Sequence, residues 1–130
     1  MTDCILDASA VLALLYAEPG AEVVQAALPG ALLSAVNAAE VIAKLNERGV
    51  PADKAAATVD WLGLEVVSFD LEQARLAGEL RPITRAAGLS LGDRACLALA
   101  RLRGLPAMTA DIVWARIPGF DVIVIRNGEA

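Results

Sequence analysis

Short apolar runs alternate along the chain with longer stretches in which apolar residues recur at helical spacing. Brief apolar runs bounded by polar residues, Gly or Pro are typical of buried strands, and the longer periodic stretches are typical of amphipathic helices. A regular alternation of the two indicates a mostly parallel sheet covered by helices. We therefore expect an α/β fold of three layers, in which a central, mostly parallel five-stranded sheet is flanked by about seven helices.

The pattern also sets the boundaries of these elements. Ser90 and Asp70 are good helix caps, Gly49 followed by Pro51 ends a helix, and Pro82 should kink or end another. No repeat, low-complexity tract or linker interrupts the pattern, so we expect one domain over residues 1–130. The expected strands are 4–6, 31–34, 64–69, 105–109 and 121–125, and the expected helices are 9–17, 21–28, 35–48, 52–62, 70–80, 90–104 and 112–117.

The amino-acid composition predicts an interface with a partner and a cellular location. Apolar residues make up 57% of the chain, above the roughly 45–50% of average globular chains, and this excess favours a dimer or partner interface. The longest stretch without charged residues, 23–39, contains Pro29 and Gly30 and is unsuited to a membrane span. No signal peptide is recognisable, and the two cysteines read as buried reduced thiols. We therefore expect a cytoplasmic protein without a membrane segment.

The net charge of −5 argues against a nucleic-acid partner, but the charges are unevenly distributed. Residues 75–116 hold seven arginines against three acids, so this region is basic while the rest of the chain is strongly acidic. Such asymmetry indicates a phosphate-binding face on an acidic body, although solvated helix faces would give the same pattern.

Two aspartates occupy equivalent positions after expected strands. Asp7 and Asp111 each lie at or just past the carboxyl end of a strand and before a helix. Open α/β sheets bind their ligands at that edge. Each residue taken alone could equally be a helix N-cap, because Asp is among the best residues at that position.

Asp93 lies on the apolar stripe of its helix, together with Cys96 and Leu97. An ionised carboxylate on a buried face requires a counter-charge, a proton or a metal ion. The structural alternative is a capping box with Ser90, because Ser-x-x-Asp approximates the Ser/Thr-x-x-Glu pattern.

Glu40 is a weaker candidate. Helical periodicity aligns it with Asn37, Lys44 and Glu47 and therefore indicates a solvated position. Its position one to two turns into the helix that follows the second strand would still let it reach a cleft at the strand ends.

The chain has no histidine, which excludes Ser-His-Asp and Cys-His catalysis and histidine-bound zinc. Two separated cysteines cannot form a thiolate cage for zinc, and no glycine-rich phosphate loop is present. Converging carboxylates repel one another unless a hard divalent cation holds them, and Mg²⁺ or Mn²⁺ is the natural occupant. Such an ion activates water for attack on a phosphoryl group, so phosphodiester hydrolysis is the expected reaction.

Four segments together resemble a known family. "ILDASAVLALLYAEPG", "SAVNAAEV", "GLSLGDRACLALA" and "PAMTAD", the last with Trp114 just after it, occur in the order and approximate spacing of a PIN-domain ribonuclease of the VapC toxin type. The resemblance spans nearly the whole chain. Two departures concern substrate preference: Ile112-Val113 stand where a charged residue is frequent, and Asn37 lies one turn before Glu40.

The resemblance implies a set of site residues and partners. It implies an endoribonuclease that acts as the toxin of a toxin–antitoxin pair and cuts single-stranded or loop RNA with metal-activated water. It also implies a small antitoxin of VapB type and a toxin homodimer. The metal ligands and catalytic residues would be Asp7, Glu40, Asp93 and Asp111, with Ser9 and Thr109 as supporting hydroxyls. Apart from the resemblance, the basic charge of residues 75–116 leads us to expect RNA phosphates to bind there, at Arg81, Arg85, Arg94 and Arg116.

Three alternatives remain at this point. A PIN nuclease with a housekeeping role in RNA processing would share the chemistry and differ in biology. A phosphoacceptor receiver domain also gathers acids at strand ends, but it needs a lysine late in the chain, and the only lysines are Lys44 and Lys54. A non-catalytic binding module would keep the fold without metal affinity.

Overall fold

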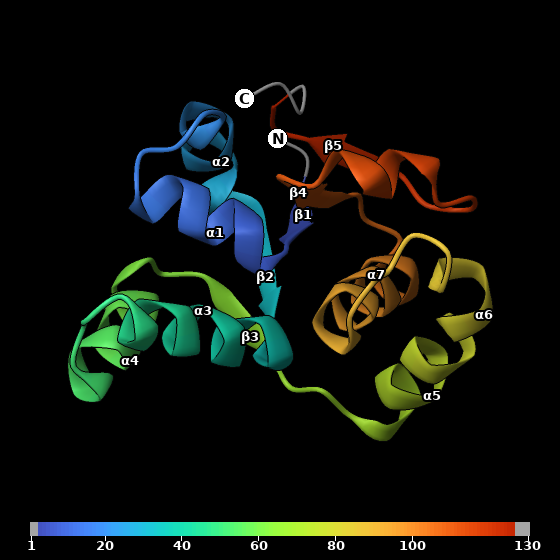
Figure 1. Ribbon diagram of the computed structural model, residues 1–130, viewed down its shortest axis with the longest axis horizontal. Helices are drawn as coiled ribbons and strands as arrows, with labels where there is room; N and C mark the ends of the chain where they lie inside the picture. The colour runs from blue at the N-terminus through green and yellow to red at the C-terminus, as the bar shows by residue number, and fades with distance from the viewer. Residues whose placement is uncertain (1–2, 127–130) are drawn as a thin grey trace.

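A five-stranded parallel sheet forms the centre of the computed structural model, which describes residues 3–126 (Figure 1). The strand order is β3-β2-β1-β4-β5, and all four neighbouring pairs run parallel. The strands are short: β1 (Cys4–Leu6), β2 (Ala31–Ser34), β3 (Glu65–Val67), β4 (Ala107–Thr109) and β5 (Val122–Val124).

Seven α-helices and two short 3-10 helices connect the strands within the described residues. Figure 1 shows α1 to α4 on one side of the sheet and α5 to α7 on the other. The α-helices are α1 (Ala8–Leu15), α2 (Ala21–Ala27), α3 (Ala35–Glu47), α4 (Ala52–Trp61), α5 (Leu71–Glu79), α6 (Arg81–Thr84) and α7 (Leu91–Arg103), and the 3-10 helices are η1 (Leu28–Gly30) and η2 (Ile112–Arg116).

Alternation along the strands builds two hydrophobic cores. On β1, Cys4 and Leu6 pack in the core beneath α1 to α4, whereas Ile5 packs in the core that α5, α7 and η2 cover. Successive side chains of a strand point to opposite faces, so a fully apolar strand serves both cores. The expected three-layer α/β fold is confirmed.

The order of the strands brings β1 and β4 together at the centre of the sheet. The chain builds β1, β2 and β3 outward on one side and then returns to add β4 on the other side of β1. This reversal is a topological switch point, where the connections from adjacent strands diverge and leave a crevice at their carboxyl ends. Asp7 and Asp111 lie immediately beyond these two strand ends.

The element boundaries differ from expectation chiefly at the strand ends. β3 stops at Val67 instead of residue 69, because the backbone carbonyl of Ser68 accepts a 2.9 Å hydrogen bond from the Gln73 side chain and Asp70 already caps α5. The expected helix at 112–117 is a 3-10 helix. As Pro82 predicted, α5 ends before it, and α6 begins with this proline in its first turn.

Within residues 3–126 we find no helix with the length and apolar character that crossing a bilayer requires.

Candidate active site

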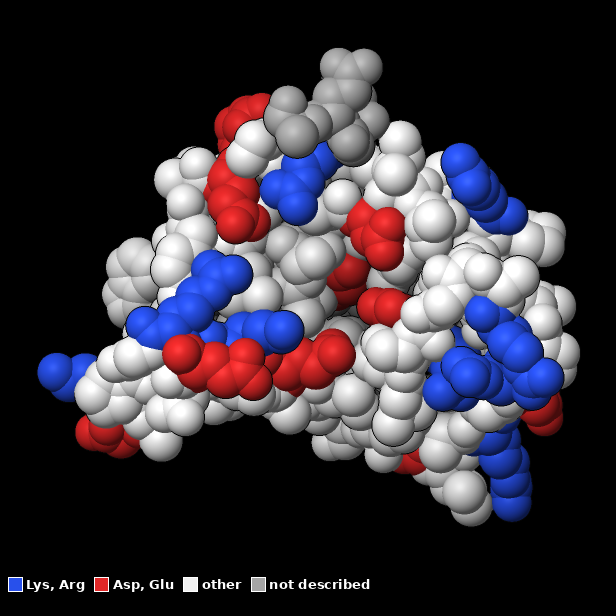
Figure 2. All heavy atoms as spheres, in the orientation of Figure 1, with Lys and Arg blue, Asp and Glu red and all other residues white. Residues whose placement is uncertain are grey.

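One pocket contains all four acids that the sequence predicted as a site. It opens where the carboxyl ends of β1 and β4 face α3 and α7, and Figure 2 shows acidic side chains gathered in a hollow at the centre of this face. Its lining residues are Asp7, Ala8, Ser9, Leu12, Glu40, Lys44, Asp93 and Asp111.

Asp7 is the most buried of these carboxylates, with 3% of its surface exposed. It caps α1 by accepting a 2.8 Å hydrogen bond from the backbone N–H of Ala10. The hydroxyls of Ser9 and Thr109 also donate to its carboxylate, at 2.8 Å and 2.6 Å. Burial raises the pKa of Asp7 to about 6, although these three donors act in the opposite direction. A carboxylate this buried, with no cation among its hydrogen-bond partners, is ready to be stabilised by a metal ion.

The two predicted supporting hydroxyls tie β1 to β4. Ser9 Oγ accepts from the backbone N–H of Ala110 at 2.9 Å, and Thr109 Oγ1 accepts from the backbone N–H of Asp111 at 3.0 Å. Each hydroxyl therefore donates its one proton toward Asp7 and accepts from the loop that follows β4. The carboxylate of Asp7 and the backbone of Asp111 are held in one network.

Asp93 combines the two roles that the sequence had left open. Its carboxylate accepts a 2.9 Å hydrogen bond from the backbone N–H of Ser90, and the Ser90 hydroxyl accepts from the backbone N–H of Asp93, which completes a capping box at the start of α7. The same half-buried side chain lines the pocket. Burial raises its pKa, and the charge of Asp111 adds to that rise.

Asp111 lies at the exposed rim of the pocket. It caps η2, because its carboxylate accepts a 3.0 Å hydrogen bond from the backbone N–H of Val113. The N-caps predicted as alternatives at Asp7 and Asp111, and the capping box predicted for Asp93, are therefore all present in residues that also line the pocket. The capping hydrogen bonds fix each residue at the start of its helix.

Glu40 is held in the pocket by Asn37, one turn earlier on α3. The Asn37 amide donates to Glu40 Oε1 at 2.8 Å and to the backbone carbonyl of Gly92 at 3.0 Å. Both partners are acceptors, so only the NH₂ group can face them, and this fixes the orientation of the amide. Asn37 is 1% exposed. Asn37 therefore links the Glu40 side chain and the backbone of α7 to one position of α3.

Gly92 provides the space that Glu40 occupies. A Cβ atom at this position would collide with the Glu40 carboxylate. Sequence reasoning missed Gly92, and it related Asn37 to substrate preference instead of to the placement of Glu40. The available signals were an Asn on the stripe of Glu40 and a Gly within the first turn of a helix, where glycine is otherwise unfavourable.

The predicted RNA-binding arginines lie away from the pocket lining. Arg81 donates to the backbone carbonyl of Leu89 at 3.3 Å, and Arg94 donates to that of Ala77 at 3.0 Å. Arg85 and Arg116 are exposed. Their contact with RNA stays a prediction.

The donor set suits a hard divalent cation. Within residues 3–126, no three Asp, Glu, Cys or His side chains converge closely enough to ligate one ion directly as they stand. Mg²⁺ usually binds through one or two carboxylates and retains several waters. A pocket lined by four carboxylates, two of them with raised pKa values, fits such a partly hydrated ion.

Comparison with known proteins identifies the family to which this fold belongs. The sequence profile of the PIN domain matches residues 4–119. This chain belongs to the PIN-domain family.

Its relatives within that family are VapC ribonucleases. It is 35% identical to the VapC ribonuclease Mb2780c of Mycobacterium bovis over 116 residues, which cover 80% of this chain and 87% of that protein. The same values hold for ribonuclease VapC42 of Mycobacterium tuberculosis.

Solved structures share the fold. DNA-bound VapBC from Salmonella typhimurium superposes with a TM-score of 0.74 at 21% identity, covering 97% of this chain and 100% of that one. VapC20 of Mycobacterium tuberculosis, a sarcin-ricin loop cleaving toxin, gives a TM-score of 0.70 at 22% identity over 90% of this chain and 95% of that one.

Proposed function

We propose that this chain is a divalent-metal-dependent endoribonuclease, the toxin of a toxin–antitoxin pair, which hydrolyses phosphodiester bonds in single-stranded or loop RNA with water as the nucleophile. The observation that carries this function is that four carboxylates line one pocket, from the ends of β1 and β4, the second turn of α3 and the first turn of α7. The similarity to VapC ribonucleases supports RNA as the substrate.

We assign the metal site to Asp7, Glu40, Asp93 and Asp111. When bound, Mg²⁺ or Mn²⁺ lowers the pKa of an attacking water and offsets the charge that develops on the phosphate. Ser9 and Thr109 orient the Asp7 carboxylate, and Asn37 orients that of Glu40. Such partners typically contribute 10- to 100-fold, by order of magnitude, to metal affinity or activity.

A small antitoxin of VapB type is the proposed protein partner. The solved structures with this fold include VapBC toxin–antitoxin complexes. We also propose a homodimer and a cytoplasmic location. The exposed apolar side chains, of which Trp61 at 84% exposure is the most open, provide surface for such interfaces, and the two free buried cysteines suit a reducing compartment.

Cleavage of a mixed RNA pool by the antitoxin-free protein tests the activity. We expect cutting with Mn²⁺ and Mg²⁺, no cutting with chelator, and a loss of more than about 100-fold in Asp93→Asn, because even outer-shell partners of a metal contribute 10- to 100-fold. Asp70→Asn is the matched control. Asp70 also caps a helix, accepting from the Gln73 backbone N–H at 2.9 Å, but it does not line the pocket.

Two results would overturn parts of this proposal. Folded, antitoxin-free protein that neither cuts RNA nor binds Mn²⁺ in calorimetry would be a binding module. Metal-dependent cutting without growth arrest on expression would instead indicate a housekeeping nuclease.

A further inference from the structure

Lys44 is the one basic residue among the residues that line the pocket. It lies on α3, four residues after Glu40, so both side chains share a face of the helix. Lys44 is exposed, and the one ion pair found within residues 3–126 joins Arg126 to Glu18. Its ammonium is therefore free to meet an anion at the edge of the carboxylate cluster.

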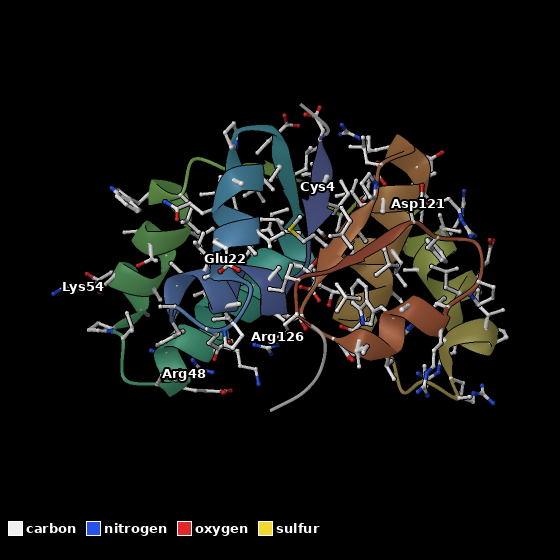
Figure 3. All side chains as sticks on the ribbon, turned by 90° about the horizontal axis from the view of Figure 1, so that it is seen from above. Cys4, Glu22, Arg48, Lys54, Asp121 and Arg126 are labelled. Carbon is white, nitrogen blue, oxygen red and sulfur yellow. The ribbon has the colours of Figure 1, made fainter. Side chains whose placement is uncertain are left out.

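Arg48 extends this face by one further turn. Its guanidinium carbon lies 4.2 Å from the centroid of the Tyr16 ring, at the end of α1. Arg48 is exposed and Tyr16 is 38% exposed. The guanidinium therefore lies over the ring in a pair that is accessible to solvent. Figure 3 shows Arg48 and Arg126 on the same side of the molecule, with Lys54 pointing away at another edge.

We propose that single-stranded RNA leaves the carboxylate pocket along α3, with one backbone phosphate on Lys44, the next on Arg48, and an unpaired base stacked on the Arg48–Tyr16 pair. This inference rests on the proposed ribonuclease activity and names the strand path at the same site. We call Lys44, Arg48 and Tyr16 the α3 track.

The chemistry of the α3 track fits a single strand. Lys44 and Arg48 are one helical turn apart, a rise of about 6 Å, so they can engage successive positions along an extended backbone. Lysine binds phosphate as a point charge, and arginine binds it through a planar fork. Unpaired bases stack on aromatic rings and on guanidinium planes, whereas the bases of a duplex are covered by their neighbours.

The basic residues on the other side of the pocket, on α5 to α7 and η2, are not part of the pocket lining. Figure 2 shows basic side chains beside the acidic hollow over α1 and α3, and a second group over α5 to α7. Arg81 on α6 and Arg94 on α7 already donate to backbone carbonyls, whereas Arg85 and Arg116 are exposed. The α3 track has its cation within the pocket lining itself.

Glu47 lies on the same side of α3 and opposes phosphate binding. The α3 track therefore depends on the placement of two cations and one ring, and its net charge is small. Removing the Glu47 charge should therefore strengthen RNA binding, which is the opposite of the effect expected from removing Lys44 or Arg48.

RNA binding measured apart from cleavage tests the α3 track. The probe is a fluorescent oligouridine, titrated with the inactive Asp93→Asn protein in Mg²⁺ over a series of salt concentrations. We expect Lys44→Ala and Arg48→Ala each to weaken binding about 3- to 10-fold at low salt and to reduce the slope of log K against log salt by about 0.7, the contribution of one single-strand phosphate. Glu47→Gln should tighten binding.

Further variants separate stacking from charge and folding. Tyr16→Ala should weaken oligouridine binding and leave duplex RNA binding unchanged, while Tyr16→Phe should behave as the parent does. Lys54→Ala removes an exposed lysine on α4 that is outside the pocket lining and should change nothing. Thermal unfolding of each variant confirms that the fold is intact.

The outcomes distinguish the α3 track from the ribonuclease proposal. Unchanged affinity and salt slope in Lys44→Ala and Arg48→Ala, with losses in Arg85→Ala and Arg116→Ala instead, would overturn the α3 track while wild-type cleavage still stands. Absence of both cleavage by the wild type and RNA binding by the parent variant would overturn both. Losses confined to the α3 track variants would establish it.

Discussion

The hydroxyl of Thr109 donates a 2.6 Å hydrogen bond to Oδ2 of Asp7, across 102 positions of the sequence. Both side chains are buried, at 0% and 3% exposure, so neither can exchange this partner for water. The bond joins the carboxyl ends of β1 and β4 at the point where the pocket opens.

Thr109→Val removes this donor while keeping the shape of the side chain. We expect the free energy of unfolding to fall by about 1–3 kcal/mol, because a buried acceptor and the backbone N–H of Asp111 each lose a partner. Mn²⁺ affinity should fall about 10- to 100-fold. Urea unfolding and titration calorimetry measure the two effects. Thr58→Val, at a threonine whose hydroxyl donates to the backbone carbonyl of Lys54 on α4, should leave metal affinity intact.

Gly92→Ala tests whether the space beside α7 positions Glu40. The added Cβ would meet the Glu40 carboxylate, so we expect RNA cleavage to fall by about 10-fold or more, as for loss of a partner that orients a ligand. Gly78→Ala is the matched control on α5, because a Cβ there meets nothing within 4 Å. It should stabilise the protein by about 0.5–1 kcal/mol and leave cleavage unchanged. Equal activity in the two variants would refute the role of Gly92.

Asn37→Asp replaces the donor to Glu40 with an acceptor of the same size. The new carboxylate would repel Glu40 and leave the backbone carbonyl of Gly92 without its partner. We expect a loss of stability of about 1–3 kcal/mol and weaker Mn²⁺ binding. Asn46→Asp is the control, since the Asn46 amide donates to the backbone carbonyl of Val50, beyond the end of α3, and Asn46 does not line the pocket. Wild-type metal affinity in Asn37→Asp would contradict the assignment.

The raised pKa of Asp7 makes the stability of the metal-free protein depend on pH. The folded chain holds the Asp7 proton up to about pH 6, whereas the unfolded carboxyl loses it near its ordinary value of 3.8. Stability from this group is therefore complete below that lower value and is lost as pH rises to about 6. The shift corresponds to roughly 3 kcal/mol by order of magnitude.

Urea unfolding in chelator checks this dependence. Wild type should lose stability relative to Asp7→Asn between about pH 4 and pH 6, and Mn²⁺ should restore stability to the wild type at pH 7. Identical pH profiles for the two proteins would show that burial does not perturb Asp7.

The alternation of short apolar runs and helical stretches was sufficient to predict the layers and the strand boundaries within a few residues. Asp7 and Asp111 could be proposed as site residues because their positions after parallel strands follow from chain topology. Asp93 could be proposed because a carboxylate on an apolar stripe requires a counter-charge, a proton or a metal ion. The structure shows that its capping box with Ser90 and its place in the pocket coexist.

Helical periodicity could not predict that Glu40 lines the pocket. Its stripe on α3 predicted a solvated position, and only the resemblance to the PIN family raised it to a candidate. The helical wheel was correct that Lys44 is exposed and wrong about Asn37, which is buried, because it could not show that α7 crosses this face with a glycine at the contact. A contact between residues 55 positions apart depends on how two helices cross, and one helix's pattern does not contain that information.

The hydrogen bond between Thr109 and Asp7 also determines how much of the chain must be synthesised before the pocket can form. Chains are made from the N-terminus at roughly 5–20 residues per second, and Thr109 follows Asp7 by 102 positions. When a ribosome is translating α7, Asp7 and Glu40 have already been made, but β4, which carries the Thr109 partner of Asp7, has not. We therefore expect the nascent chain to be unable to cut the messenger from which it is made until β4 and Asp111 have joined the sheet.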